Sequence, residues 1–222
     1  QAGTTLSPCT ETANPNFDMQ NMNKRFISLN LRTEAGRAAM MKLLETADVF
    51  LTNFREQALE GMGLAYEQLK DRFPRLIHAG VLGYGSEGPD RDRPGYDYTV
   101  FFSRTGLMAD LPPAGAGPLV PIGGIGDHSV AVALIGGIAA ALYRREITGE
   151  GDKVDVSLYQ SGIFILCTGI LNGFNGRVLP RTRYDCGHAG SNTYQGSDGE
   201  WFYLACIDYR RFPELCRLIG RP

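Results

Sequence analysis

The sequence lacks the residue patterns that hold structural metals or disulfide frameworks. Its 222 residues include five cysteines, an odd number with no C-x-x-C pair, and only three histidines, which are scattered. Zinc sites and redox dithiols need closely spaced cysteines, so both are disfavoured. The histidines support neither a metal site nor a Ser–His–Asp set. The cysteines fit reduced thiols in a cytoplasmic protein.

The chain also lacks an excess of charge of either sign. A formal net charge of −2 gives no electrostatic reason to expect nucleic acid. Residues 156–176 carry no charge over about a membrane span, but Ser, Thr, Asn and Gln interrupt them, so a buried helix is expected and no membrane partner. The chain opens on Gln1 with no charged-then-apolar leader, and we expect it to be part of a longer protein.

What is present is an alternation of strand and helix patterns. Strands are predicted at 26–31, 49–51 and 76–82. Between them lie a predicted helix at 34–46 and a helical stretch in two parts, 57–62 and 66–72. This order is typical of a parallel sheet with helical crossovers. The remaining predictions are a loop at 1–22, helices at 98–108, 129–145, 158–174 and 212–219, a strand at 153–157, and a hairpin at 194–204 that turns at Asp198-Gly199.

The predicted fold class is therefore α/β. We expect a large domain over residues 1–185, built on a Rossmann-like parallel sheet, and the beginning of a small α/β domain over residues 191–222. In the large domain, Gly83 to Gly88 match the G-x-G-x-x-G pattern of dinucleotide-binding proteins directly after a predicted strand. The pattern needs a helix immediately after it, and a Pro- and charge-rich loop follows instead. A nicotinamide-dependent oxidoreductase is thus a disfavoured alternative.

Two aspartates lie where loops meet predicted helices. Asp127 follows Gly123-Gly124-Ile125-Gly126 and comes before the apolar helix predicted from Ser129. It can be a helix N-cap, or a carboxylate nucleophile that glycines leave open to a thioester. Asp97 ends Pro94-Gly95-Tyr96-Asp97 and can equally be a cap or a second acid.

Polar residues elsewhere have plainer interpretations. Asn53 follows the end of a predicted strand, at the sheet edge where ligands bind in open α/β folds, or it is an ordinary turn residue. His78 lies inside a predicted strand and is interpreted as a core residue, whereas His188 lies in a loop and is left unassigned.

Several segments, taken in order over residues 20–220, together resemble the class III CoA-transferases, which include formyl-CoA and carnitine CoA-transferases and the related α-methylacyl-CoA racemase. The segments that carry the resemblance are Asn23-Lys24-Arg25, 27–31, 47–50 with Asn53-Phe54, Met62-Gly63-Leu64, Gly83-Tyr84-Gly85 with Gly88-Pro89, 94–97, Gly126-Asp127, and 144–151 with 154–158; the hairpin at Asp198-Gly199 fits the second domain of that family.

The resemblance implies an enzyme that uses coenzyme A or acyl-CoA as a substrate, with no permanently bound cofactor and no metal. It also implies an interlocked homodimer and a chain that lacks the first strand and helix of the family and the end of the small domain. The catalytic aspartate of the family falls on Asp127, and an acid that lines the acyl site falls on Asp97. The implied CoA contacts are Leu29, Arg32, Asn53, Phe54, Met62 and Tyr96.

The implied reaction is the transfer of CoA from an acyl-CoA to a carboxylic acid through an aspartyl anhydride and an aspartyl-CoA thioester. Gly61 stands where some members have an arginine, which puts one phosphate contact in doubt. The related racemases have histidine at the position of Tyr96, so tyrosine favours transfer over racemisation, which is the main alternative. A catalytically inactive subunit is a further alternative. Gly126-Asp127-His128 and nearby aromatic residues look most like the branch that acts on 2-hydroxy acids and aryl acids.

Overall fold

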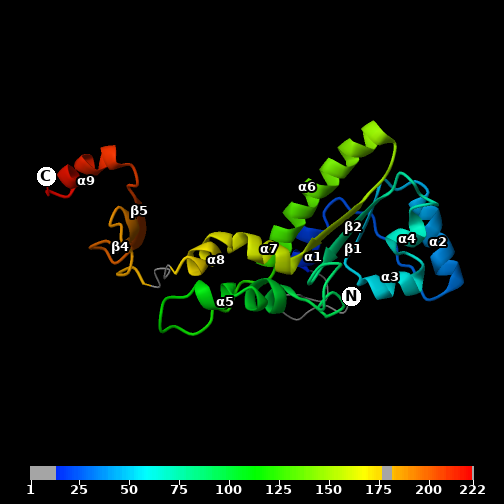
Figure 1. The fold of residues 1–222 in the computed structure, drawn as a ribbon, viewed down its shortest axis with the longest axis horizontal. Helices are drawn as coiled ribbons and strands as arrows, with labels where there is room; N and C mark the ends of the chain where they lie inside the picture. Colours follow the sequence, from blue (N-terminus) through cyan, green and yellow to red (C-terminus); the bar gives the residue numbers. More distant parts are fainter. Residues whose placement is uncertain (1–13, 177–181, 222) are drawn as a thin grey trace. The chain divides into compact units, whose positions relative to one another are not determined.

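The computed structural model describes residues 14–176 and 182–221. The chain divides into two units, residues 1–46 and residues 47–222 (Figure 1). Helices and a parallel three-stranded sheet make the fold mixed α/β, as the sequence indicates. The domain boundary expected between 185 and 191 stays a prediction.

The first unit contains two capped helices. Helix α1 (Pro15–Gln20) begins after Asn14, whose Oδ1 accepts the amide of Phe17 at 3.1 Å. The loop predicted over 1–22 is therefore wrong at α1, and residues 1–13 lie outside the described residues. The helix predicted at 34–46 is confirmed as α2 (Glu34–Leu44), with Thr33 as its N-cap.

The strand predicted at 26–31 is wrong. The segment is irregular, and Phe26 is 67% exposed. Its alternating pattern would suit a half-buried strand, but a strand forms only where a neighbour completes the hydrogen-bond ladder. Within the described residues, the segment pairs with no strand.

The second unit is built on the predicted parallel sheet. Strands β1 (Val49–Thr52), β2 (Ile77–Leu82) and β3 (Lys153–Ser157) lie in the order β1-β2-β3 and are all parallel. Helices α3 (Glu56–Met62) and α4 (Tyr66–Leu69) form the crossover from β1 to β2. The alternation of patterns along the sequence thus predicted this part of the fold.

Strand β2 lies at the centre of the sheet and is its most buried strand. Ile77 pairs with Val49 of β1, and His78 pairs with Lys153 of β3. His78 is buried, and its Nε2 donates to the carbonyl of Leu64 at 3.1 Å. The interpretation of His78 as a core residue is confirmed.

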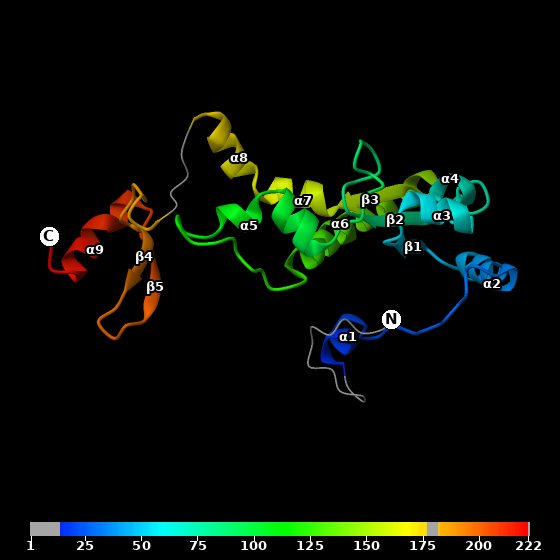
Figure 2. The ribbon, with the colours of Figure 1, turned by 90° about the horizontal axis from the view of Figure 1, so that it is seen from below.

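Helix α6 (Ile125–Thr148) is the long crossover helix that precedes β3. It lies along β2 and β3 in both views (Figures 1 and 2). It extends beyond the predicted 129–145 at both ends. Its flanking residues are Gly124 and Gly149, both in left-handed conformations, with φ of 90° and 79°. Near its end, the buried Arg145 places Nη2 2.9 Å from Oδ1 of the exposed Asp48, which ties α6 to the residue before β1.

The helix predicted at 98–108 is two segments. The first, η1 (Asp97–Arg104), is a π-helix, and the second is α5 (Leu107–Asp110); Gly106, with φ of 96°, separates them. Three consecutive residues of η1, 100–102, are buried in one cluster with residues of α5, α6 and α7. This cluster therefore packs η1 against the N-terminal part of α6.

The helix predicted at 158–174 is broken in the middle. It forms α7 (Leu158–Ile165) and α8 (Cys167–Phe174), with Leu166 between them at φ −82° and ψ 0°. Nothing in the structure explains the break. Each half has eight residues, fewer than the roughly 20 that cross a bilayer. Among the described residues, only α6 is long and apolar enough to cross a bilayer. Core helices share this length and composition, so they do not identify α6 as a membrane span.

The C-terminal elements match the predicted ones. Strands β4 (Ser191–Gln195) and β5 (Trp201–Ala205) form an antiparallel hairpin, and Gly199, with φ of 85°, supplies the left-handed turn residue. A 3₁₀ turn, η2 (Tyr209–Arg211), leads into α9 (Phe212–Leu218).

Large apolar side chains are exposed on three segments of the chain, 26–31, 129–145 and 158–174. Large exposed residues on these segments are Phe26, Ile27, Val132, Ile135, Tyr143, Phe164, Ile165, Leu171 and Phe174. Such surface normally contacts another partner or segment.

Two adjacent glycines of α6 give a matched test of its packing on the sheet. A Cβ on Gly137 would lie 2.6 Å from Cγ1 of Val154 in β3, whereas one on Gly136 would meet nothing within 4 Å. Gly137→Ala should lower the free energy of unfolding by about 1–3 kcal/mol through overpacking. Gly136→Ala should raise it by about 0.5–1 kcal/mol through helix propensity. Urea denaturation of both variants measures this, and equal effects would contradict the packing of α6 on β3.

Candidate active site

The loop after β2 returns the chain to the carboxyl edge of the sheet. Gly83 and Gly95, at its two ends, pack backbone to backbone: a Cβ on Gly95 would lie 2.7 Å from Cα of Gly83. The match to G-x-G-x-x-G at 83–88 therefore opens into a loop, and the next helical segment begins only at Asp97, as the sequence predicts. The contact between Gly83 and Gly95 brings the two ends of the loop together, and we call residues 83–95 the closed loop. Tyr96 and Asp97, which follow it, therefore lie near the end of β2.

A cleft of about 320 Å³ lies at this edge. Four of the predicted site residues line it: Asn53 after β1, Tyr96 and Asp97 after the closed loop, and Asp127 on α6. Tyr96 is 69% exposed. The structure thus brings together residues up to 74 positions apart, because the carboxyl ends of parallel strands meet at one edge. The rest of the lining is Arg55, Val81, Leu82, Gly83, Arg91, Arg93, Pro94, Gly95 and Leu158.

Asp97 is the more buried of the two acids, at 5% exposure. Its Oδ2 accepts the amide of Gly124 at 2.6 Å, and its Oδ1 accepts the amide of Gly126 at 3.0 Å. Both oxygens therefore bind the N-terminal turn of α6 from a segment 27 residues away. A carboxylate at this end of a helix is also favoured by the helix dipole.

Asp127 is the third residue of α6, and the N-cap position belongs to Gly124. The N-cap interpretation of Asp127 is therefore wrong: Gly124 has no side chain, and Asp97 supplies the oxygen atoms that a cap would supply. The Asp127 carboxylate accepts no hydrogen bond from the described residues. Asp127 lines the cleft.

The environment of Asp127 raises the pKa of its carboxyl group above the ordinary value. Although the residue as a whole is exposed, partial burial of the carboxyl in the cleft is the largest cause. The negative charge of Asp97 raises the pKa further, and His128 opposes both effects. Two carboxylates in one cleft thus make Asp127 more basic than a solvated aspartate.

The other predicted contacts lie outside the cleft lining. Phe54, beside Asn53, is exposed, and Met62, at the end of α3, is half-buried. Neither lines the cleft. Leu29 and Arg32 belong to the unit of residues 1–46. The roles of all the predicted site residues stay predictions.

Sequence reasoning missed three arginines of the cleft. Arg55 follows β1, and Arg91 and Arg93 belong to the closed loop. Arg55 Nη1 donates to the carbonyl of Asp92 at 2.9 Å, which joins the two segments. The alternating Asp-Arg-Asp-Arg run before Pro94 indicates a charged loop in the sequence, but it does not indicate that the loop lines the cleft. Within the loop, Arg91 pairs with Asp92 at 3.2 Å and Arg93 with Asp90 at 3.0 Å.

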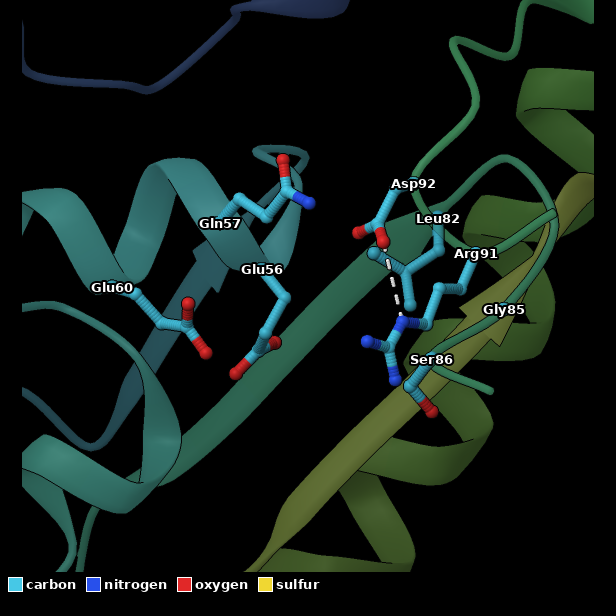
Figure 3. A pocket seen from close by; sticks show the side chains of 8 residues that line it. All are labelled: Glu56, Gln57, Glu60, Leu82, Gly85, Ser86, Arg91 and Asp92. Carbon is cyan, nitrogen blue, oxygen red and sulfur yellow. Dashed lines mark hydrogen bonds and ion pairs between the residues drawn. The ribbon is translucent and has the colours of Figure 1, made fainter. Parts of the chain in front are cut away.

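A second hollow of about 230 Å³ shares Leu82 and Arg91 with the cleft. Figure 3 shows Glu56 and Glu60 of α3 on one side and Arg91, paired with Asp92 at 3.2 Å, on the other. Glu56 also pairs with Lys153 of β3 at 3.4 Å. Arg91 and Glu56 are therefore both ion-paired at the edge of this hollow.

Among the described residues, no three acidic, Cys or His side chains are grouped to hold a metal ion. Four cysteines there carry free thiols, and Cys9 lies outside the described residues.

A comparison with protein families identifies the family of the chain. The model of CoA-transferase family III matches residues 4–222. The chain belongs to CoA-transferase family III. The resemblance identified in the sequence is confirmed.

Curated members of the family are similar over most of this chain. The (R)-2-hydroxy-4-methylpentanoate CoA-transferase of Clostridioides difficile is 40% identical over 99% of the chain and 55% of its own length. The cinnamoyl-CoA:phenyllactate CoA-transferase of Clostridium sporogenes is 39% identical over 90% of the chain and 49% of its own length. The chain therefore spans about half the length of the curated relatives it matches.

Solved structures agree with the fold. A CAIB/BAIF family protein from Brucella suis is 30% identical with a TM-score of 0.73, over 89% of this chain and 52% of its own. The hypothetical protein Rv3272 from Mycobacterium tuberculosis is 28% identical with a TM-score of 0.79, over 91% and 55%.

The raised pKa of Asp127 predicts how the pH dependence of stability changes in Asp127→Asn. Because the folded state holds the Asp127 proton more tightly than the unfolded state, ionisation of Asp127 lowers the stability of the wild type as pH rises from the ordinary to the raised pKa. The free energy of unfolding of Asp127→Asn, relative to wild type, should therefore rise between about pH 3 and about pH 7. Chemical denaturation across this range measures it. The opposite trend would mean that the Asp127 charge stabilises α6.

Proposed function

We propose that the protein transfers CoA from an acyl-CoA to a carboxylic acid, with Asp127 as the nucleophile. The observation that carries the proposal is the free carboxylate of Asp127 in a cleft at the carboxyl edge of the sheet. Its raised pKa supports nucleophilic attack, since a more basic carboxylate is a better nucleophile.

The reaction balances without any added oxidant or reductant. An Asp127 oxygen attacks the thioester carbonyl carbon, the carbon–sulfur bond breaks, and the CoA thiolate leaves with the electron pair. The thiolate then attacks the Asp127 carbonyl of the resulting anhydride and releases the first carboxylic acid. The incoming carboxylate attacks the carbonyl carbon of this aspartyl thioester, which expels the CoA thiolate and forms a second anhydride. The thiolate then attacks the new acyl carbonyl of that anhydride, which gives the new acyl-CoA and releases the Asp127 carboxylate. CoA is a substrate in this scheme and no bound cofactor is needed.

Arg55 supports an anionic acid as the acceptor. It lines the same cleft as Asp127, and its guanidinium donates to a backbone carbonyl, whereas Arg91 and Arg93 already pair with Asp92 and Asp90. Of the predicted CoA contacts, Asn53 and Tyr96 line this cleft, which supports placing the pantetheine thioester here.

We propose 2-hydroxy acids or aryl acids as the substrate class. Support comes from the names of two relatives, which act on 2-hydroxy-4-methylpentanoate and on phenyllactate. The whole protein should therefore transfer CoA to 2-hydroxy-4-methylpentanoate with a kcat/KM at least about tenfold above that for 4-methylpentanoate, because a site that hydrogen-bonds a hydroxyl rejects the analogue without it. Equal values in a competition assay would contradict this choice.

We also propose a cytoplasmic homodimer. Exposed apolar residues on α6 and α8, among them Ile135 and Phe174, support a partner subunit, and the unpaired thiols support a reducing compartment. Sedimentation of the whole protein at two concentrations tests the dimer.

Removal of the Asp127 carboxylate gives the decisive test. In the whole protein, Asp127→Ala and Asp127→Asn should each lower transfer at least about 1000-fold, because neither side chain can form the anhydride. CoA binding should survive in both variants. Incubation of wild type with acyl-CoA and then hydroxylamine should add mass to the peptide that contains Asp127.

A variant of the other hollow serves as the control. Glu60→Gln removes a carboxylate from the neighbouring pocket and should leave the labelling of Asp127 intact. Full activity of Asp127→Asn would refute the nucleophile. Rapid exchange of the α-hydrogen of an acyl-CoA in deuterated water would favour a racemase instead.

A further inference from the structure

We propose that Asp97 is a positioning residue: it caps α6 from outside the helix and so holds the Asp127 backbone at the cleft. The proposal rests on the proposed function for the role of Asp127, but its evidence is the hydrogen bonding of Asp97. A second catalytic acid would need a carboxylate exposed to substrate. Asp97 is instead buried, and each of its oxygens accepts a backbone amide, from Gly124 and from Gly126.

The start of α6 needs such a cap. The first amides of a helix have no partner within the helix, and the N-cap side chain usually supplies one. Gly124 is the N-cap and has none. With Asp97 removed, the turn that carries Asp127 would lose both of these hydrogen bonds, although α6 would remain anchored further along by its contacts with β2 and β3.

Asp97 is itself held rigidly. It is the first residue of η1, and Val100 and Phe101 of η1 are buried in the core. Before it, the amide of Tyr96 donates to Thr99 Oγ1 at 3.1 Å and orders the entry to η1. Because η1 is packed in the core, the hydrogen bonds of Asp97 fix the first turn of α6 relative to the core.

Gly126 is part of the same device. A Cβ on Gly126 would overlap Asp97 Oδ1 and the ring of Phe101. Only glycine lets the carboxylate approach the helix this closely. The glycine before Asp127 thus serves the Asp97 contact.

Amide hydrogen exchange tests the proposal without any assay of activity. In Asp97→Asn, which keeps one acceptor oxygen, and in Asp97→Ala, exchange at Gly124 and Gly126 should become about 10- to 100-fold faster, because hydrogen bonds to a charged group are lost. Exchange in β2 and β3 should not change. Asp127→Asn, which removes the other cleft carboxylate but no acceptor of these amides, is the matched control and should leave Gly124 and Gly126 protected.

Two results would overturn the proposal. Unchanged exchange at Gly124 and Gly126 in Asp97→Ala would mean that the cap does not hold the turn. Faster exchange throughout β2 and β3 in Asp97→Asn would mean that Asp97 stabilises the whole fold rather than placing Asp127.

A second measurement separates this proposal from the proposed function. At saturating acyl-CoA, Asp97→Asn should slow hydroxylamine labelling of Asp127 at least about tenfold, with the half-saturating concentration unchanged, because the nucleophile is misplaced while the CoA contacts remain. Unslowed labelling would refute the positioning role. Absence of labelling in wild type would instead refute the proposed function, and the exchange result would still stand.

Discussion

The candidate site depends on one contact, the pair of hydrogen bonds from the amides of Gly124 and Gly126 to the carboxylate of Asp97. This contact joins the two halves of the cleft, the segment that follows β2 and the helix that precedes β3. It satisfies the helix end and places a negative charge beside a second one. As a result, Asp97 accepts backbone hydrogen bonds, whereas Asp127 lines the cleft without a hydrogen bond from the described residues.

The sheet provides the frame for this contact. Strand β2 pairs with β1 and β3, and its buried residues form the floor on which α6 lies. Gly137 allows α6 to approach β3 closely, and Arg145 ties the far end of the helix to Asp48. Because both ends of α6 are fixed to the sheet or to η1, the position of Asp127 follows from packing rather than from its own loop.

The electrostatics of the cleft follow from this geometry. Burial and Asp97 raise the pKa of Asp127, while Arg55, Arg91 and Arg93 bring positive charge to the same wall. For the proposed reaction, a more basic carboxylate favours attack on a thioester.

The sequence by itself determined the parallel sheet, the hairpin turn at Gly199 and the family, because local periodicity and ordered motifs are properties of the chain. It also placed Asn53, Tyr96 and Asp127 at the ends of elements. It failed for the strand at 26–31, which depends on a neighbour, and for the N-cap of α6. Only the tertiary structure assigned the capping oxygens to Asp97, because a contact across 27 residues forms through the packing of η1 and leaves no local pattern.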